Sequence, residues 1–179
     1  MTIMDKIDAQ AHTIVNRLFD RELLNYTEAA NLYSFVSQGY LNKSILTVMH
    51  NQARDPALKK LIRRAIEEQN EAVIVQAAKW LDAKNAEVPA NQQPQRQLHE
   101  EPLSLPLDAS LTDAELAMAL AMMAKAAQQT MLMAMQTAYQ PELINMYRKH
   151  LDSGFDFSYR IIKLALDRGW LPYQAKIEH

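Results

Sequence analysis

Two short stretches decide the fold of this chain: Asp55-Pro56-Ala57-Leu58 and, 85 residues later, Gln140-Pro141-Glu142-Leu143. Proline lacks an amide hydrogen and fits the first turn of a helix, so each stretch ends one helix and begins the next. The same shift places Thr27-Glu28-Ala29 on Thr112-Asp113-Ala114. This constant offset predicts two copies of one helical hairpin.

The helices of the first copy are predicted from the residues at their ends. Thr27 is the expected N-cap, and the two helices are expected over about residues 27–53 and 56–85. The apolar stripe of the second of these helices passes through five residues, Leu58, Ile62, Ala65, Val73 and Trp80. We expect this stripe to face the core.

The second copy repeats the pattern. Thr112 followed by Glu115 has the spacing of a capping box, Pro141 opens the last helix and Gly169 ends it. A hairpin of this length cannot bury its apolar stripes alone. We therefore expect the two hairpins to pack against each other as a four-helix bundle.

A proline-rich segment over residues 86–110 contains four of the seven prolines of the chain. A long connection between two hairpins is typical of ferritin-like bundles. The predicted fold is therefore all-α, a ferritin-like four-helix bundle of two repeated hairpins with a long crossover and an extra N-terminal helix. We expect a single domain over 1–179, divided into the N-terminal helix (1–25), first hairpin (26–89), crossover (90–110), second hairpin (111–172) and tail (173–179).

Composition excludes several classes of function. The net charge is −2, so no basic field indicates nucleic-acid binding. The chain has no cysteine, which excludes disulfides, thiolate catalysis and cysteine metal sites. Its first residues lack the pattern of a secretory signal, and we expect a cytoplasmic location.

The stretch from Leu116 to Met135 is rich in alanine and methionine but carries Lys125 and Gln128 near its middle. We therefore expect no membrane span and assign a deeply buried bundle helix instead. Six of the ten methionines lie here: Met118, Met122, Met123, Met131, Met133 and Met135. We interpret them as filling gaps in a crowded core; the alternatives are a Cu(I) site or an adaptable interaction surface.

A ferritin-like bundle raises the question of a di-iron site, which uses Glu-x-x-His pairs. The chain contains no such pair. If a metal is bound, the candidate ligands are Glu67, Glu71, His150 and Asp152. The carboxylates have basic neighbours one helical turn away, in the pairs Arg63–Glu67, Arg64–Glu68, Arg148–Asp152 and Asp156–Arg160. We therefore expect solvated salt-bridge faces, and neither a metal nor another cofactor.

The five histidines receive separate interpretations. His150 lies on an apolar stripe one turn from Tyr147, so we expect a hydrogen-bonded core residue, with ligation or proton transfer as the alternative. His50 lies near the end of its helix, where an imidazolium suits the helix dipole. His12, His99 and His179 are expected at the surface.

The two copies, read together, resemble a known family. The residues that carry the likeness are 26–33 (YTEAANLY), 55–61 (DPALKKL), 111–117 (LTDAELA) and 167–171 (DRGWL). They resemble a ferritin-like family of unknown function from spore-forming bacilli, whose members are similar to spore coat protein F. The resemblance implies a helical bundle and a role in the spore coat, on its mother-cell side, and implies no catalytic residues.

Three functions follow from these observations. We expect a non-enzymatic structural or interaction protein, associated with the spore coat, that binds protein partners or other copies of itself. The first alternative is a ferritin-like metal-binding oxidoreductase with a degenerate or unusual site. The second is a carrier of a small apolar ligand in the methionine-rich interior.

Overall fold

The computed structural model describes residues 23–171, and these residues form helices and no strand. Four long helical segments build the fold: α2 (Tyr26–Gln52); a continuous segment of α3 (Pro56–Arg64), the π-helix η1 (Ala65–Asn70) and α4 (Glu71–Ala83); α5 (Asp113–Thr137); and α6 (Pro141–Asp167). The prediction of an all-α protein is confirmed. The predicted N-terminal helix, the tail, His12 and His179 lie outside the described residues.

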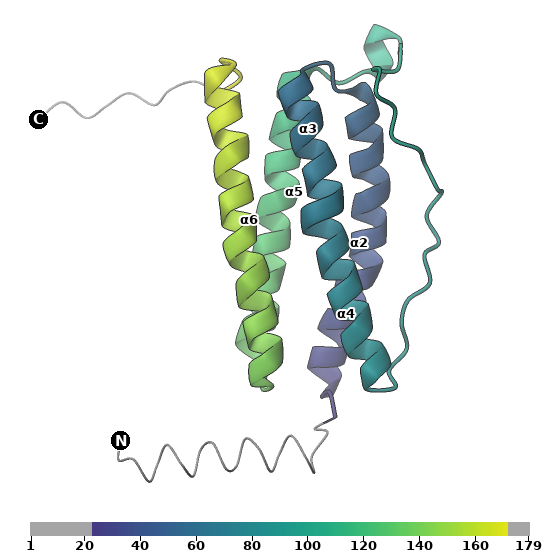
Figure 1. Ribbon diagram of the computed structural model, residues 1–179, viewed down its shortest axis with the longest axis vertical. Coiled ribbons are helices and arrows are strands. Elements are labelled where there is room, and N and C mark those ends of the chain that lie inside the picture. The colour runs from purple at the N-terminus through teal and green to yellow at the C-terminus, as the bar shows by residue number, and fades with distance from the viewer. Residues whose placement is uncertain (1–22, 172–179) are drawn as a thin grey trace, which may run out of the picture.

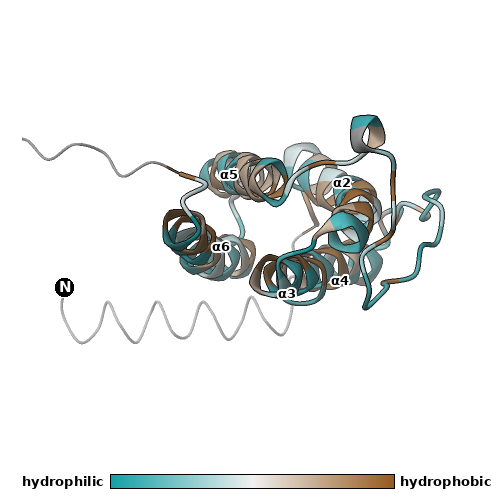
Figure 2. Cartoon of the chain, turned by 90° about the horizontal axis from the view of Figure 1, so that it is seen from above, coloured by the Kyte–Doolittle hydropathy of each residue, from teal (hydrophilic) through white to brown (hydrophobic). Residues whose placement is uncertain are grey.

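The four segments stand side by side (Figure 1). α2 packs antiparallel against α3–α4, and α5 packs antiparallel against α6. Seen from above, the segments occupy the corners of a square, with α5 next to α2 and α6 next to α3 (Figure 2). One end of the bundle therefore collects the α2–α3 turn and the start of α5, and the other end collects the α5–α6 turn and the start of α2.

The crossover between the hairpins covers residues 84–112, longer than predicted, and includes only the short 3-10 helix η2 (Leu107–Ala109). It runs along the outside of the first hairpin (Figure 1). α4 ends at Ala83 because Asn85 adopts a left-handed conformation, with φ of 54°, and the amide of Ala86 returns to the carbonyl of Leu81 at 2.9 Å. This is the usual way in which asparagine ends a helix.

The N-cap of α2 differs from the prediction. Asn25, not Thr27, caps the helix: its side chain accepts from the amide of Glu28 at 2.9 Å, and the Glu28 carboxylate accepts from the amide of Asn25 at 3.1 Å. Asparagine caps as well as threonine, and a glutamate at the third helical position completes the capping box. The prediction of Thr112 with Glu115 at the start of α5 was correct.

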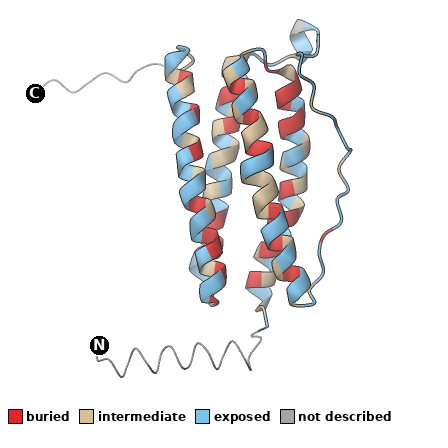
Figure 3. Cartoon of the chain, in the orientation of Figure 1, coloured by how far each residue is buried: buried red, intermediate tan, exposed pale blue. Residues whose placement is uncertain are grey.

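The core consists of two apolar clusters stacked along the bundle. Buried residues occur on all four helical segments (red in Figure 3). One cluster lies near the α5–α6 turn and includes Leu32, Phe35, Leu81 and the fully buried Tyr147. The other lies near the α2–α3 turn and includes Leu46, Ile62, Leu120 and Phe157. All four helical segments contribute side chains to each cluster, so this packing joins the two hairpins.

The stripe predicted for α3–α4 holds only as far as η1. Leu58, Ile62 and Ala65 are buried as predicted, but beyond η1 the buried residues are Ile74, Ala77 and Leu81. Val73 and Trp80 lie at intermediate depth instead. The wider π turn holds one residue more than an α turn, so the buried stripe moves on by one residue, from Val73 and Trp80 to Ile74 and Leu81.

α5 is less buried than predicted. Met118, Met122 and Met133 expose 43%, 70% and 68% of their surface, whereas Met131 is buried. The helix packs on α6 and α2 and leaves its outer side open, so these methionines do not fill a crowded core. Within residues 23–171, no helix is long and apolar enough to cross a membrane.

Each hairpin contributes one carboxylate that accepts hydrogen bonds from the turn of the other hairpin. We call these two residues, Glu28 and Asp113, the turn-binding carboxylates. Glu28 accepts from the amides of Tyr139 at 2.8 Å and Gln140 at 3.1 Å, in the α5–α6 turn. Asp113 accepts from the amides of Arg54 at 2.8 Å and Asp55 at 3.0 Å, in the α2–α3 turn. Each carboxylate and each amide of the first set lies 85 residues from its counterpart in the second.

Candidate functional site

A cavity of about 750 Å³ interrupts the core between the two clusters; we call it the mid-bundle chamber. Phe35, Met131 and Leu151 of one cluster and Leu46 and Phe157 of the other form part of its walls. Protein cores normally pack with few voids larger than a water molecule. A space of this size between two well-packed clusters is therefore the main candidate for a ligand site.

Small residues make the space. Gly39, Ala65, Ala124, Ala127 and Gly154 all line the chamber, where leucine, isoleucine or phenylalanine side chains would fill it. Gly39 also lets α2 approach α4 closely, since a Cβ there would lie 2.4 Å from Cγ1 of Ile74. At this level the side chains of Ile74 and Gln128 lie directly against the backbone of Gly39 and Gly154.

The π-helix η1 forms one wall of the chamber. Asn70 donates from Nδ2 to the carbonyl of Gly39 at 2.8 Å, which ties η1 to α2. Gln69 donates from Nε2 to Oγ of Ser153 at 2.9 Å, which ties η1 to α6. π-helical turns are rare and are frequent at functional sites. Here the extra residue places two amide side chains at the wall and bonds them to two other helices.

The opposite wall is held by Gln128 of α5. Its Nε2 donates to the carbonyl of Gly154 and to Oγ of Ser158, both at 2.7 Å. These bonds use both amide hydrogens of the side chain. Gln128 therefore fixes the distance between α5 and α6 beside the chamber, while its carbonyl oxygen has no partner in the described part of the chain.

Of the described residues that line the chamber, His150 alone is titratable. Its Nε2 lies 3.1 Å from Oε1 of Gln76, so it is hydrogen-bonded to α4 and not to Tyr147. Burial lowers the pKa of His150, which favours a neutral imidazole. Burial, and then the charge of Glu28, raise the pKa of Tyr147 far above its usual range.

The carboxylates considered as metal ligands lie apart. Glu67 and Asp152 are exposed, and Glu71 forms an ion pair with Lys43 at 2.7 Å. Over residues 23–171, no three His, Asp or Glu side chains come together as a metal ion requires. His150 contributes to the chamber wall alone, without a carboxylate beside it.

The predicted salt bridges are partly present. Arg64 pairs with Glu68 at 2.7 Å, as predicted. Arg63 pairs instead with Glu100, because the crossover passes over α3 and brings that carboxylate to it. The prediction for Arg63 was wrong because the local spacing did not include a segment 37 residues away.

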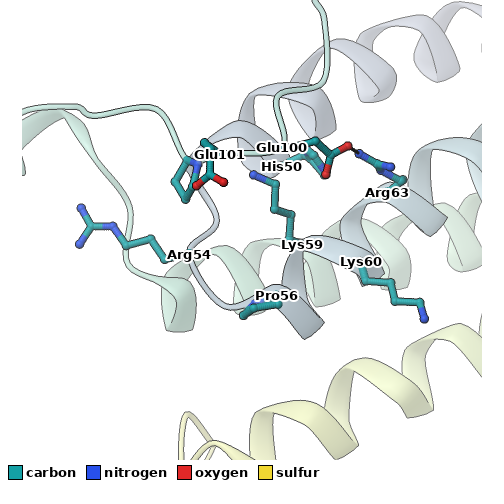
Figure 4. A pocket seen from close by; sticks show the side chains of 9 residues that line it. His50, Arg54, Pro56, Lys59, Lys60, Arg63, Glu100 and Glu101 are labelled. Carbon is teal, nitrogen blue, oxygen red and sulfur yellow. Dashed lines mark hydrogen bonds and ion pairs between the residues drawn. The ribbon is translucent and has the colours of Figure 1, made fainter.

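A second cavity, of about 540 Å³, lies where the crossover covers the end of α2 and the start of α3 (Figure 4). Lys59 reaches into this region, and its buried ammonium has no hydrogen-bond partner among the described residues. Arg54 and Lys60 extend outward to either side, and Glu100 and Glu101 lie close to Lys59 (Figure 4). The two carboxylates offset two of the four positive charges among the described lining residues, which are those of Arg54, Lys59, Lys60 and Arg63.

The crossover is fastened there by Asn51. Its Nδ2 donates to the carbonyl of Gln97 at 2.9 Å, and its Oδ1 accepts from the amide of His99 at 2.8 Å. The covering segment buries His50, which is 1% exposed, and burial lowers its pKa. The predicted imidazolium at this helix end was therefore wrong, because the crossover removes the solvent that would stabilise it.

The sequence did not predict the mid-bundle chamber. A signal was present, since Gly39, Ala124, Gln128 and Gly154 are small or amide residues in the middle of long apolar helices. Their meaning depends on which helices face each other at that level, and the sequence alone does not supply this.

Fold and cavity together define an all-helical protein of four packed segments with an uncharged chamber at mid-height. The chain belongs to the family described as a protein of unknown function (DUF3231), which matches residues 13–175. A crystal structure from Bacillus halodurans C-125, described as a "putative spore coat protein", has a similar fold, with a TM-score of 0.80. The two chains are 20% identical, and the likeness covers 88% of this chain and 98% of the other. Among curated proteins, none matches this chain.

Proposed function

We propose that this chain is a non-enzymatic structural or interaction protein of the bacterial spore coat. The observation that carries the proposal is the likeness in fold to the Bacillus halodurans protein described as a "putative spore coat protein", which extends over nearly all of that chain. Exposed apolar side chains on α6, Phe155, Tyr159 and Ile162, offer contacts to protein partners or to further copies of the chain.

Localisation during sporulation tests this proposal. A fluorescent fusion expressed in a sporulating bacillus is expected to collect around the forespore on its mother-cell side and to remain with the coat fraction of purified spores. An unfused fluorescent protein under the same promoter is the control. Fluorescence that stays spread through the mother cell would overturn the coat function.

We further propose that the bundle is ferritin-like and arose from two repeated hairpins within a single domain. The long crossover between the hairpins supports the first part. The turn-binding carboxylates support the second, because Glu28 and Asp113 make equivalent bonds at positions 85 residues apart. On this view, the kinship with spore coat protein F is one of architecture.

A metal-binding oxidoreductase is the rival function, with Glu67, Glu71, His150 and Asp152 as its candidate ligands. The separation of these residues argues against it. Metal analysis of protein purified without chelators is the test. Iron or manganese at one ion per chain, lost in Glu71→Ala or His150→Ala, would replace the structural proposal with the enzymatic one.

A second candidate function is the carriage of a small apolar ligand, and the mid-bundle chamber favours it. Its volume of about 750 Å³ falls in the range of roughly 300–1,000 Å³ that is usual for ligand pockets. Native mass spectrometry of freshly purified protein is expected to show an added mass that is lost on denaturation. A spectrum of the bare chain alone, from several hosts, would count against a carrier.

A further inference from the structure

We propose that the mid-bundle chamber binds an uncharged small molecule with an apolar body and one hydrogen-bonding group, and that this molecule enters between α2 and α5. The inference rests on the carrier function proposed above and adds the class of ligand and its route. It follows from the charge of the chamber lining, the partners of its amide groups and the exposure of the residues at its rim.

The lining excludes charged ligands. Among residues 23–171, no Asp, Glu, Lys or Arg side chain lines the chamber, and burial favours the neutral form of His150. A charged group that leaves water for such a site loses its hydration without gaining a counter-ion. The chamber therefore favours neutral molecules over both anions and cations of the same shape.

The walls suit an apolar body of variable shape. Phe35, Leu46, Leu120, Leu151 and Phe157 supply rigid apolar surface from three of the four segments. Two methionines of α5, Met123 and Met131, also line the space. Thioether side chains adapt to the outline of a ligand more readily than branched ones do. We expect recognition of size and polarity more than of one defined shape.

The chamber wall offers one hydrogen-bond acceptor to a polar group of the ligand. The bonds from Gln128 to Gly154 and Ser158 use both of its amide hydrogens and leave its carbonyl oxygen as an acceptor. Across the chamber, Asn70 uses one amide hydrogen on Gly39 and has a second in reserve. A ligand hydroxyl or N–H group would donate to Gln128 without disturbing the bonds that hold the walls.

The exposure of the lining residues indicates where a ligand enters the chamber. In the described part of the chain, the exposed lining residues belong to two helices: Ser34, Gln38 and Ile45 of α2, and Ala126, Ala127 and Thr130 of α5. Every lining residue of η1, α4 and α6 is buried or of intermediate depth. The opening therefore lies between α2 and α5, where small side chains on α5 leave it unobstructed.

Two dyes with the same ring system test the ligand class. N-phenyl-1-naphthylamine is neutral and carries one N–H group, whereas 1-anilinonaphthalene-8-sulfonate adds a permanent negative charge to the same rings. Fluorescence titration of the full chain is expected to give binding of the neutral dye at least about tenfold tighter than that of the anion. Equal binding of the two dyes, or no binding of the neutral dye, would overturn the inference.

Two matched variants test the route. Ala127→Phe places a ring at the opening and is expected to weaken binding of the neutral dye by about tenfold, which corresponds to about 1.4 kcal/mol. Ala30→Phe makes the same change at an exposed position of α2 outside the chamber and is expected to leave binding unchanged. Thermal melts by circular dichroism establish that both variants fold. Equal binding to folded wild type and Ala127→Phe would overturn the route.

The outcome separates this inference from the carrier function. If native mass spectrometry finds a bound charged molecule while the neutral dye is excluded, the chain is a carrier and the inference on ligand class fails. If the chain carries no added mass and neither dye binds above the level of Ala127→Phe, both fail. Displacement of the natural ligand by the neutral dye, but not by the anion, supports both.

Discussion

Glu28 and Asp113 perform the same task at opposite ends of the bundle, in different surroundings. Each accepts two backbone amides from the turn of the other hairpin, with N···O distances between 2.8 and 3.1 Å. Glu28 is only 2% exposed, whereas the bonds of Asp113 lie at or near the surface. The two sets of bonds have similar geometry but do not stabilise the fold equally. Water can hydrate the amides freed by a loss of Asp113, but it cannot reach those freed by a loss of Glu28.

The largest effect is expected at the buried end. Glu28→Ala leaves the amides of Tyr139 and Gln140 without a partner and removes half of the capping box of α2. We expect a loss of about 3 kcal/mol in the free energy of unfolding, measured by urea denaturation. Glu28→Gln keeps one acceptor and should lose less. A smaller loss for Glu28→Ala than for Asp113→Ala would contradict the comparison.

Tyr147 tests whether the buried end is dry. Its hydroxyl is fully buried near Glu28 and has no hydrogen-bond partner among the described residues. Tyr147→Phe removes this unsatisfied group and keeps the ring that contacts Phe35. We expect stabilisation by about 1.5 kcal/mol in the same assay. Destabilisation would mean that water or a partner reaches the hydroxyl in solution.

The exposed end is expected to tolerate the matching change. Asp113→Ala frees the amides of Arg54 and Asp55, but solvent can hydrate them. We expect a loss of about 1 kcal/mol, part of it from the missing negative charge at the start of α5. Asp152→Ala, at an exposed position within a helix, serves as the control for removal of a carboxylate.

The smallest effect concerns pH, and we expect it at the Asp113 end. Burial lowers the folded-state pKa of His50 below the 6.5 of an unfolded histidine, so the unfolded chain binds the proton more readily. Stability is therefore complete above that pH and is lost as the pH falls below it. Melting temperatures between pH 7.5 and 5 should fall less for His50→Gln than for wild type. Equal slopes would show that His50 remains accessible.

A second loss is expected in stronger acid at the same end. Burial raises the pKa of Asp55, but hydrogen bonds from Arg168 and from the amides of Leu58 and Ala57 outweigh it and lower the pKa below 3.8. The stability that these bonds supply is present above that value and is lost as the pH falls through the lower, folded-state pKa. Arg168→Gln should move this acid transition to higher pH.

The sequence predicted features that depend on neighbouring residues and missed those that depend on distant ones. Asp55-Pro56 and Gln140-Pro141 mark both turns correctly, and Thr112 with Glu115 caps α5, because each signal acts within one helical turn. The bonds of Glu28 join residues more than 100 positions apart, and no local pattern indicates them. The burial of His50 and the pairing of Arg63 depend likewise on where the crossover lies.

The π-helix η1 changes which side chains of α4 face the core, compared with a continuous α-helix of the same sequence. An α-helix turns about 100° per residue, so the residue that η1 adds rotates all of α4 by about that angle relative to α3. The segment between α3 and α4 can thus be regarded as carrying a one-residue insertion, which the helix accommodates as a π turn without ending. If the same sequence continued as an uninterrupted α-helix through residues 65–70, both hairpins would remain but Val73 and Trp80 would turn inward. The bulk of the tryptophan ring would then compete for the interior, so the π turn, as much as the composition of this segment, sets what the protein can contain.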